Sequence, residues 1–132
     1  MATLWNLTQA LQVDFAGLLE GRARPGIEIT RAGSAPVIER GGVTIRILSP
    51  AEAVGENEVY DLVFAPGAAL VSEPHGPGCR EHLTVIEGRL RVVSGAEAED
   101  LGPGDVARYP ADRDHEIAAA GAARAILIVQ GS

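Results

Sequence analysis

The stretch His75-Gly-Pro-Gly-Cys-Arg-Glu-His-Leu-Thr-Val-Ile-Glu-Gly88 combines a turn, a strand and a second turn with imidazole and carboxylate side chains. A second stretch, Gly104-Asp-Val-Ala-Arg-Tyr-Pro-Ala-Asp-Arg-Asp-His115, has the same organisation further along the chain. Each predicts a short strand bounded by Gly- and Pro-containing turns. Together they bring two histidines and a glutamate from distant parts of the chain towards one site. Imidazole and carboxylate are the side chains that hold borderline divalent metals.

Outside these stretches, apolar and polar residues alternate over several short segments, which is typical of half-buried strands. The chain has 16 Gly and 8 Pro in 132 residues, and these turn formers suit many short strands better than long helices. Hairpins are predicted at Glu87-Gly88 and around Gly121. The sequence therefore predicts an all-β antiparallel sandwich or barrel. The predicted strands are 27–31, 43–47, 59–64, 83–86, 90–93, 106–109 and 125–129.

Residues 2–20 are the segment with helical periodicity: leucines recur at helical spacing, and Thr3 and Asp14 are placed to cap two short helices. Isolated helices shorter than ~12–15 residues are marginal in water. This segment is therefore expected to pack on the rest of the chain, on a second copy or on residues upstream. Residues 21–26, which are rich in Arg, Pro and Gly, predict a linker.

The charge of the chain is unevenly distributed. The formal net charge is −7, and residues 51–132 carry six Arg against fourteen acids. Such a body repels a phosphate backbone, which argues against nucleic-acid binding by this part of the chain. The single cysteine, Cys79, cannot form an internal disulfide, and this favours a reducing compartment. The first twenty residues lack a basic start, and no run approaches the ~20 apolar residues of a membrane span, so we expect a cytoplasmic location.

Three side chains are candidates for a common site. Successive side chains of a strand alternate in direction, so Glu81 and His82 are expected on opposite faces. If the sheets close into a barrel, His75, Glu81 and His115 converge on its interior. Two interpretations stay open: these donors hold Zn, Mn, Fe or Ni with open coordination positions, or they bond to one another, to water or to an organic ligand. Tyr109 is a further residue expected to contact a bound ligand.

The spacing of these residues resembles the two motifs of the cupin family. The pattern His75-x-Pro-x3-Glu81-x6-Gly88 is similar to the first motif, whose usual form has two His, then Glu, then Gly. The pattern Gly104-x5-Pro-x-Asp-x2-His115 is similar to the second, which usually has Gly, Pro, Gly and His. The resemblance implies a double-stranded β-helix (jelly-roll) barrel.

The resemblance also implies a ligand set, from which this sequence departs. Pro77 stands where the second His of the first motif is expected, and Asp112 replaces the Gly of the second motif. The usual four metal ligands are thereby reduced to three. The motifs lie within residues 57–130, and the implied metal-ligand positions are His75, Glu81 and His115.

A second resemblance concerns the start of the chain. Residues 3–19 are similar to the last two helices of the phage-repressor-like (Xre) helix-turn-helix domain, which in bacterial regulators often precedes a linker and a cupin sensor domain. The same order is expected here, with a helical remnant over 1–20, a linker over 21–26 and a cupin domain over 27–132. The recognition helix lies upstream in that family, so we expect Met1 to mark a truncated or misassigned start.

These resemblances imply a ligand-sensing and dimerisation domain of a DNA-binding transcriptional regulator. A small-molecule effector would enter the barrel and shift the geometry of a homodimer. DNA would be bound only through an upstream helix-turn-helix domain that this chain lacks. The alternative is a small metal-dependent cupin enzyme of the dioxygenase or isomerase type, whose substrate would take the open metal positions. No general base is evident beyond the ligands, so a non-enzymatic role is favoured and no catalytic residue is predicted.

Overall fold

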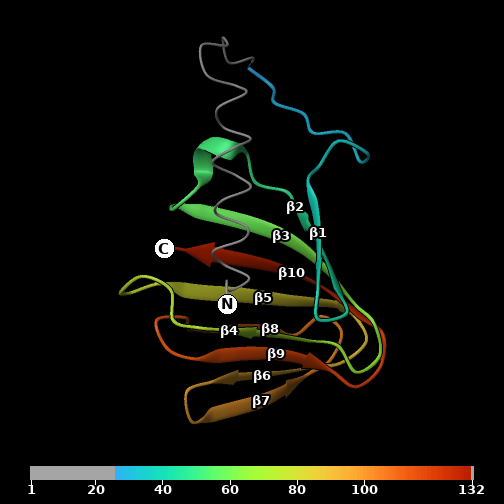
Figure 1. Cartoon of the computed structure of the whole chain (residues 1–132), viewed down its shortest axis with the longest axis vertical. Helices are drawn as coiled ribbons and strands as arrows, with labels where there is room; N and C mark the ends of the chain where they lie inside the picture. Colours follow the sequence, from blue (N-terminus) through green and yellow to red (C-terminus); the bar gives the residue numbers. More distant parts are fainter. Residues whose placement is uncertain (1–25, 132) are drawn as a thin grey trace.

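The computed structural model describes residues 26–131, and these form ten strands and one short 3-10 turn. The strands make a six-stranded sheet with the order β1-β2-β3-β10-β5-β8 and a four-stranded sheet with the order β4-β9-β6-β7 (Figure 1). The elements are β1 (Val37–Arg40), β2 (Val43–Ile47), η1 (Ala51–Ala53), β3 (Asn57–Phe64), β4 (Ala69–Ser72), β5 (Arg80–Glu87), β6 (Leu90–Ser94), β7 (Glu97–Leu101), β8 (Val106–Pro110), β9 (His115–Ala119) and β10 (Ala123–Gln130).

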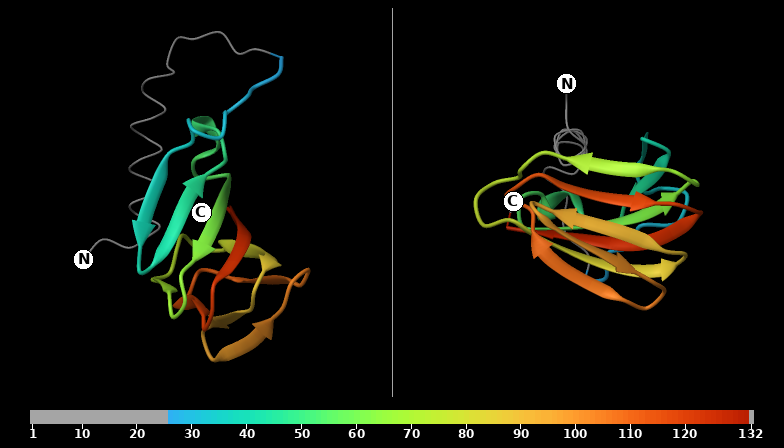
Figure 2. Two further views of the ribbon diagram at one scale, coloured as in Figure 1. Left: turned by 90° about the vertical axis from the view of Figure 1, so that its right-hand side faces the viewer. Right: turned by 90° about the horizontal axis from the view of Figure 1, so that it is seen from below.

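The two sheets face each other, and every strand pairing within them is antiparallel (Figure 2). From β3 onwards the chain passes back and forth between the sheets, so that β3, β5, β8 and β10 lie in one sheet and β4, β6, β7 and β9 in the other. This crossing is the pattern of a jelly-roll barrel. The predicted all-β jelly-roll fold is therefore confirmed.

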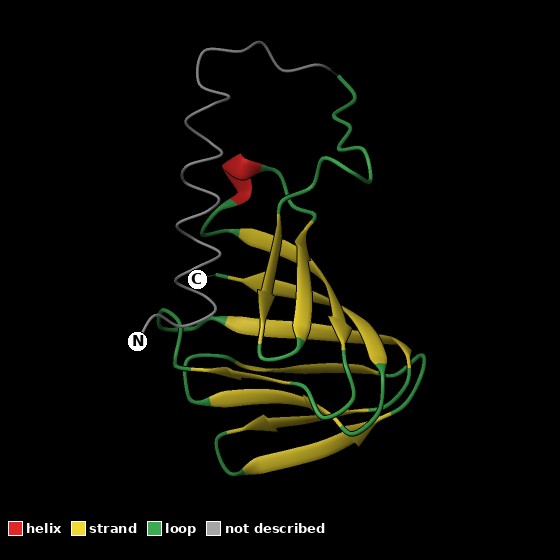
Figure 3. Ribbon diagram, turned by 45° about the vertical axis from the view of Figure 1, so that its right-hand side comes forward, coloured by secondary structure: helices red, strands yellow, loops and turns green. Residues whose placement is uncertain are grey.

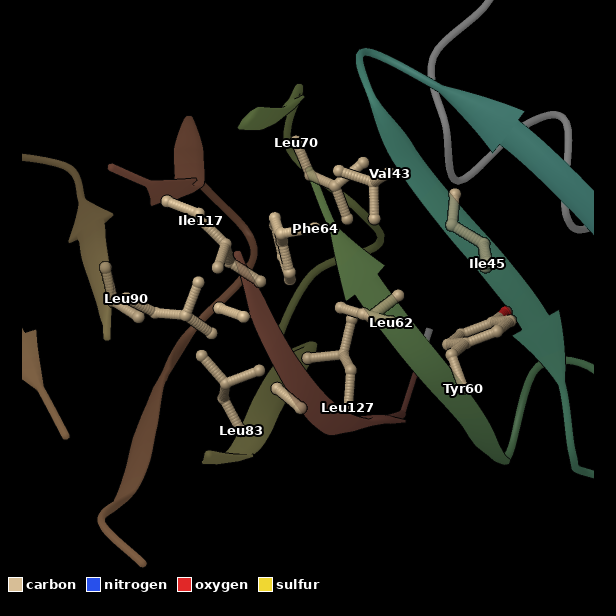
Figure 4. Packing of buried hydrophobic residues seen from close by; sticks show 14 of the residues in the cluster. Val43, Ile45, Tyr60, Leu62, Phe64, Leu70, Leu83, Leu90, Ile117 and Leu127 are labelled. Carbon is tan, nitrogen blue, oxygen red and sulfur yellow. The ribbon is translucent and has the colours of Figure 1, made fainter. Parts of the chain in front are cut away.

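The core lies between the sheets. It is built from the inward-facing residues, which alternate with outward-facing residues along each strand. In β2 and β9 every second residue is buried, as expected for strands with one face on the core. Figure 4 shows aliphatic side chains from both sheets pointing towards one another, with Leu62 and Leu83 on one side and Ile117 on the other. Each fully buried side chain of this size contributes about 1.5–3 kcal/mol. The core thus gives the strands a rigid frame on which to position polar groups.

Gly88, the last residue of the first motif, forms the turn between β5 and β6. Its φ is 76°, a left-handed conformation that glycine adopts without strain. A Cβ at this position would also overlap the backbone carbonyl of Ala122 and the Cα of Ala123. Glycine is therefore required twice over, once by the backbone angle and once by the close approach of the neighbouring segment.

Two predicted hairpins have the right turns but the wrong partners. Turns occur at Gly88 and Gly121, yet β5 and β6 lie in different sheets, as do β9 and β10 (Figure 1). In Figure 3, green loops connect the yellow strands of one sheet to those of the other. The prediction that these strands fold back on each other is wrong. In a jelly roll, consecutive strands cross from one sheet to the other, and the period-2 pattern does not specify which strand becomes the hydrogen-bonded neighbour.

The strand predicted over 27–31 is also wrong. This segment is irregular and leads into a turn in which the Ser34 amide donates to the Arg31 carbonyl at 2.9 Å. Ile27 and Ile29 are 78% and 61% exposed, so their alternation has no sheet face to cover. Four short strands were missed by the pattern, namely β1, β4, β7 and β9.

The expected helical remnant and nearly all of the linker, residues 1–25, lie outside the described residues. In the part of the chain that is described, no helix has the length and hydrophobicity needed to traverse a lipid bilayer.

Candidate metal centre

The three predicted donors lie together between the two sheets. His75 comes from the loop between β4 and β5, Glu81 is the second residue of β5, and His115 is the first residue of β9. One potential ligand atom from each side chain lies within 4.8 Å of the others. Their side chains are 2–3% exposed. The fold therefore brings together residues that are far apart in the sequence and shields them from bulk water.

Glu81 is the centre of this cluster. Its Oε2 atom accepts hydrogen bonds from Nε2 of His75 at 3.0 Å and from Nε2 of His115 at 2.9 Å. Its other oxygen, Oε1, accepts a hydrogen bond from the Tyr109 hydroxyl at 2.7 Å. Tyr109 reaches this position because it is the direct cross-strand partner of Glu81 in the β5–β8 pairing. Both carboxylate oxygens are thus occupied: Oε2 by one histidine from each motif, and Oε1 by Tyr109 of the second motif.

The loop that carries His75 is tied to the segment that follows β8. The His75 amide donates to the Ala111 carbonyl at 2.8 Å, and the Ala111 amide donates to the Cys79 carbonyl at 2.8 Å. The Gly78 amide donates to Asp112 Oδ2 at 3.3 Å. This hydrogen bond is the main reason why the pKa of the exposed Asp112 carboxyl lies below its usual value. Asp112, which departs from the family pattern, therefore links the two motifs.

The orientation of the His115 ring is fixed by a hydrogen bond at Nδ1, the ring nitrogen that does not contact Glu81. Its Nδ1 lies 2.8 Å from the carbonyl oxygen of Arg113, which can only accept, so Nδ1 carries a proton. This leaves Nε2 directed at Glu81. Metal-ligating histidines characteristically donate their second ring N–H to a carbonyl or carboxylate in this way. The backbone of this chain thus holds His115 in the orientation that a metal ligand requires.

The electrostatics of the cluster follow from its burial and its hydrogen bonds. Burial alone would raise the pKa of Glu81, but the hydrogen bonds from His115 and His75 outweigh it and bring that pKa from 4.5 to about 2. Burial would lower the pKa of His115, but the hydrogen bond and charge of Glu81 raise it. Burial and the Glu81 charge raise the pKa of Tyr109 well above 10. At neutral pH the cluster therefore holds an ionised Glu81 and a protonated tyrosine donor.

The donor set fits a divalent metal. Two ligand atoms that each lie ~2.1 Å from one ion are about 3.0 Å apart if they subtend a right angle and about 3.4 Å apart at the tetrahedral angle of zinc sites. The Nε2–Oε2 separations of 3.0 and 2.9 Å at His75, Glu81 and His115 are close to the first of these spacings, so small side-chain movements would admit an ion. An ion would take the place of the protons now shared between these atoms, so its binding would release protons. The cluster offers two nitrogen ligands and one oxygen ligand, which suits Zn, Mn, Fe or Ni without selecting one of them.

A cavity adjoins the cluster, and Glu81 and His75 are among the residues that line it. The volume of this cavity is about 20 Å³. As it stands, the cavity holds about one water molecule or ion. Most of the wall is aliphatic, and several of its side chains are seen in Figure 4. The described residues that line it are Ile45, Tyr60, Leu62, Leu70, Ser72, His75, Glu81, Ile117, Leu127 and Val129.

The structure also gives the positions of His82 and Tyr109, the other two residues considered for the site. His82 points to the opposite face of β5 from Glu81 and is only half-buried, as the alternation of the strand predicts. Tyr109, which is expected to contact a ligand, donates its hydroxyl proton to the carboxylate of Glu81. Sequence reasoning missed Glu58, which is fully buried and accepts a hydrogen bond from the Tyr60 hydroxyl at 3.0 Å. The alternation of Glu58 and Tyr60 along one strand would have placed this acid on the inner face.

The fold and the motifs agree with a match to a known family. The family model described as Cupin domain (Cupin_2) matches residues 60–130, which is more than half of the chain. The chain therefore belongs to the Cupin_2 family, and the resemblance seen in the two motifs is confirmed.

The chain is also similar to bacterial regulators. The HTH-type transcriptional regulator SutR of Escherichia coli K12 is 30% identical over 115 residues, which cover 87% of this chain and 61% of that protein. A crystal structure of an HTH_3 family transcriptional regulator from Vibrio cholerae is 27% identical, with a TM-score of 0.63 over 67% of this chain and 51% of that one. The Cupin_2 domain of an XRE family transcriptional regulator from Enterobacter cloacae shares the fold, with 24% identity and a TM-score of 0.62 over 67% of this chain and 96% of that domain. The predicted relationship to Xre-type regulators is confirmed, and the chain spans less than two thirds of the length of SutR.

Proposed function

We propose that this chain is the effector-sensing and dimerisation part of an Xre-type transcriptional regulator. The observation that carries the proposal is its similarity to SutR over 87% of the chain, which includes the barrel with its buried polar cluster. In such a regulator, an effector acts only through a difference in its affinity for two conformations of the protein. DNA contact belongs to a helix-turn-helix domain, since the body of this chain is strongly acidic. This assignment goes with a cytoplasmic location and a homodimer.

Within this role, His75, Glu81 and His115 would hold one divalent metal ion. The ion would act as a Lewis acid whose open coordination positions bind a polar group of the effector. Glu81 and His75 face the cavity, so a molecule that enters the barrel meets the metal-binding end directly. The arrangement supports Zn, Mn, Fe or Ni, because each of these accepts imidazole and carboxylate together.

The lining of the cavity indicates the class of effector. Away from the cluster, the described wall is aliphatic apart from Ser72 and the ring of Tyr60. A polyol or sugar would leave most of its hydroxyls without hydrogen-bond partners there, at a cost of about 1–3 kcal/mol for each. The wall suits a small aliphatic body with a single polar head directed at the cluster. Since the cavity holds little more than a water molecule, it has to widen for such an effector to bind.

The metal assignment is tested by elemental mass spectrometry on the purified chain, on a His115→Ala variant and on a His82→Ala control. We expect near-stoichiometric metal in the chain and in the control, and loss of metal from the His115→Ala variant. Metal-free protein that takes up no added Zn, Mn, Fe or Ni would contradict the assignment.

The regulatory assignment is tested by replacing the matching region of SutR with the 115-residue matching region of this chain. A reporter behind a SutR-controlled promoter should be regulated by the chimera and should respond differently to a chimera with His115→Ala. The chain alone, at physiological salt, should not shift the same promoter fragment in a gel. A chimera that is folded and dimeric yet has no effect on the promoter would contradict the assignment.

A small metal-dependent enzyme is the second candidate function. It is favoured by the donor set itself, because three protein ligands leave coordination positions for a substrate. Besides Glu81 and His75, the described residues that line the cavity include one other titratable side chain, Tyr60. Its hydroxyl donates a hydrogen bond to Glu58. A general acid or base would therefore have to come from the metal ligands. Turnover of a small carboxylate or ketone by the metal-loaded chain would favour the enzyme.

A further inference from the structure

We infer that Tyr109 is a positioning residue for the metal centre: its hydroxyl holds Oε1 of Glu81 so that the carboxylate presents one oxygen, Oε2, to a bound ion. The inference rests on the proposed metal site and adds to it a residue outside the ligand set. This role is distinct from the expected contact of Tyr109 with an effector. It also predicts how Glu81 binds the ion, through a single oxygen atom.

The first observation behind this inference is that the two carboxylate oxygens of Glu81 have different hydrogen-bond partners. Oε2 of Glu81 faces both imidazoles, at 3.0 and 2.9 Å, whereas Oε1 accepts only the phenolic proton of Tyr109 among the hydrogen bonds described for it, at 2.7 Å. An O–H···O⁻ bond of this length is a strong, charge-assisted one. An ion bound through both oxygens would compete with the Tyr109 proton for the electron density of Oε1.

The second observation is that Tyr109 cannot easily move away. It lies opposite Glu81 in the β5–β8 pairing and is 6% exposed, within the hydrophobic core. Its ring also lies beside that of His115, with the ring centroids 6.4 Å apart. Register, burial and ring packing therefore fix the hydroxyl at one place, and this is what an outer-shell partner of a metal ligand requires.

The chain contains a matched control for a test of this role. Tyr60 is also a buried tyrosine whose hydroxyl donates to a buried glutamate, Glu58, at 3.0 Å. Both Tyr109→Phe and Tyr60→Phe remove one hydroxyl and leave one buried carboxylate oxygen without that bond. Both are expected to lower thermal stability to a similar degree. Because Tyr60 lines the cavity beside the cluster, the comparison is made on metal binding with no effector present, and there only Tyr109→Phe is expected to act on the metal.

The experiment compares the full chain with these two variants, using Zn²⁺ affinity from chelator competition and the visible absorption of bound Co²⁺. Tyr109→Phe should weaken Zn²⁺ binding by about 10–100-fold, the usual loss for an outer-shell partner. It should also change the Co²⁺ spectrum, because a released carboxylate can bind through two oxygens and alter the coordination number. Tyr60→Phe should keep the affinity and the spectrum of the unmodified chain.

Several outcomes would overturn the inference. Unchanged affinity and spectrum in Tyr109→Phe would do so, and so would an equal loss in Tyr60→Phe, which would mean that any buried hydroxyl has the same effect. If Tyr109→Phe does not fold, X-ray absorption of Zn²⁺ in the unmodified chain decides: one carboxylate oxygen at bonding distance supports the inference, and two contradict it. No Zn²⁺ or Co²⁺ binding by the unmodified chain removes the metal site and this inference with it, whereas binding that ignores Tyr109 removes the inference alone.

Discussion

Glu81 and Glu58 are two acids on the same inner face of the six-stranded sheet. In the cross-strand register both pair with Val129 of β10, one from β5 and the other from β3. Two strand spacings place their backbones roughly 10 Å apart. Both side chains are buried, and each accepts a hydrogen bond from a tyrosine hydroxyl, at 2.7 Å for Glu81 and 3.0 Å for Glu58. In burial and tyrosine partner, the two sites are nearly the same.

The two sites differ in the side chains that neighbouring segments place beside each acid. Glu81 meets two imidazoles, one from the β4–β5 loop and one from the start of β9. Glu58 lies on the far side of Val129 from that group. A buried carboxylate with a tyrosine partner is therefore a structural element of this barrel, and the two histidines turn one copy of it into a candidate metal centre. Changes made in parallel at the two acids separate the structural role from the functional one.

The largest expected contrast is in metal binding by Glu81→Gln and Glu58→Gln. The amide at position 81 keeps the size of the side chain but loses the charge, and its single oxygen has to serve either Tyr109 or the position that both histidines face. We expect Glu81→Gln to weaken Zn²⁺ binding by more than ~100-fold, beyond the loss that an outer-shell partner causes. Glu58→Gln should bind Zn²⁺ as the unmodified chain does. Chelator competition measures both, and a comparable loss in the two variants would mean that the acids are not distinct.

The next contrast is in the pH dependence of stability of the metal-free chain. The pKa of Glu81 is lowered from 4.5 to about 2, so its stabilisation is fully present above about pH 4.5 and is lost as the pH falls towards 2. The pKa of His115 is raised, so its stabilisation is present below its ordinary value of 6.5 and is lost as the pH rises through the higher folded value. The cluster therefore stabilises the fold most between these limits.

Urea unfolding over this pH range measures the effect. The stability difference between the unmodified chain and Glu81→Gln should be largest at weakly acidic pH, with an upper limit of about 3 kcal/mol from the carboxyl alone. It should shrink towards pH 2 as the native carboxylate becomes protonated. A difference that stays constant from pH 2 to neutrality would show that the charge of Glu81 contributes nothing to folding.

The sequence alone predicts only part of the fold and of the candidate site. Motif spacing predicted the barrel and the meeting of His75, Glu81 and His115, because alternation along β5 fixes which side chains face inward. The Tyr109–Glu81 bond could not be predicted, since it depends on the β5–β8 register, which neither strand encodes by itself. The same limit explains the wrong hairpin partners. Glu58 was accessible in principle, because it alternates with buried Tyr60 and Leu62, but charged residues are seldom fully buried.

The smallest expected contrast concerns Cys79, because the charges of both acids affect the pKa of its thiol. Its thiol is buried, and burial is the main reason why its pKa is raised from 9.0 to about 11, with the charges of Glu81 and then Glu58 adding to the effect. Removing either charge should lower the thiol pKa, and Glu81→Gln should lower it more than Glu58→Gln. The S–H stretching band in Raman spectra follows this titration without requiring a reagent to reach the buried sulfur. The opposite order would place Glu58 nearer in effect to the thiol, whereas no change in either variant would leave burial as the whole cause.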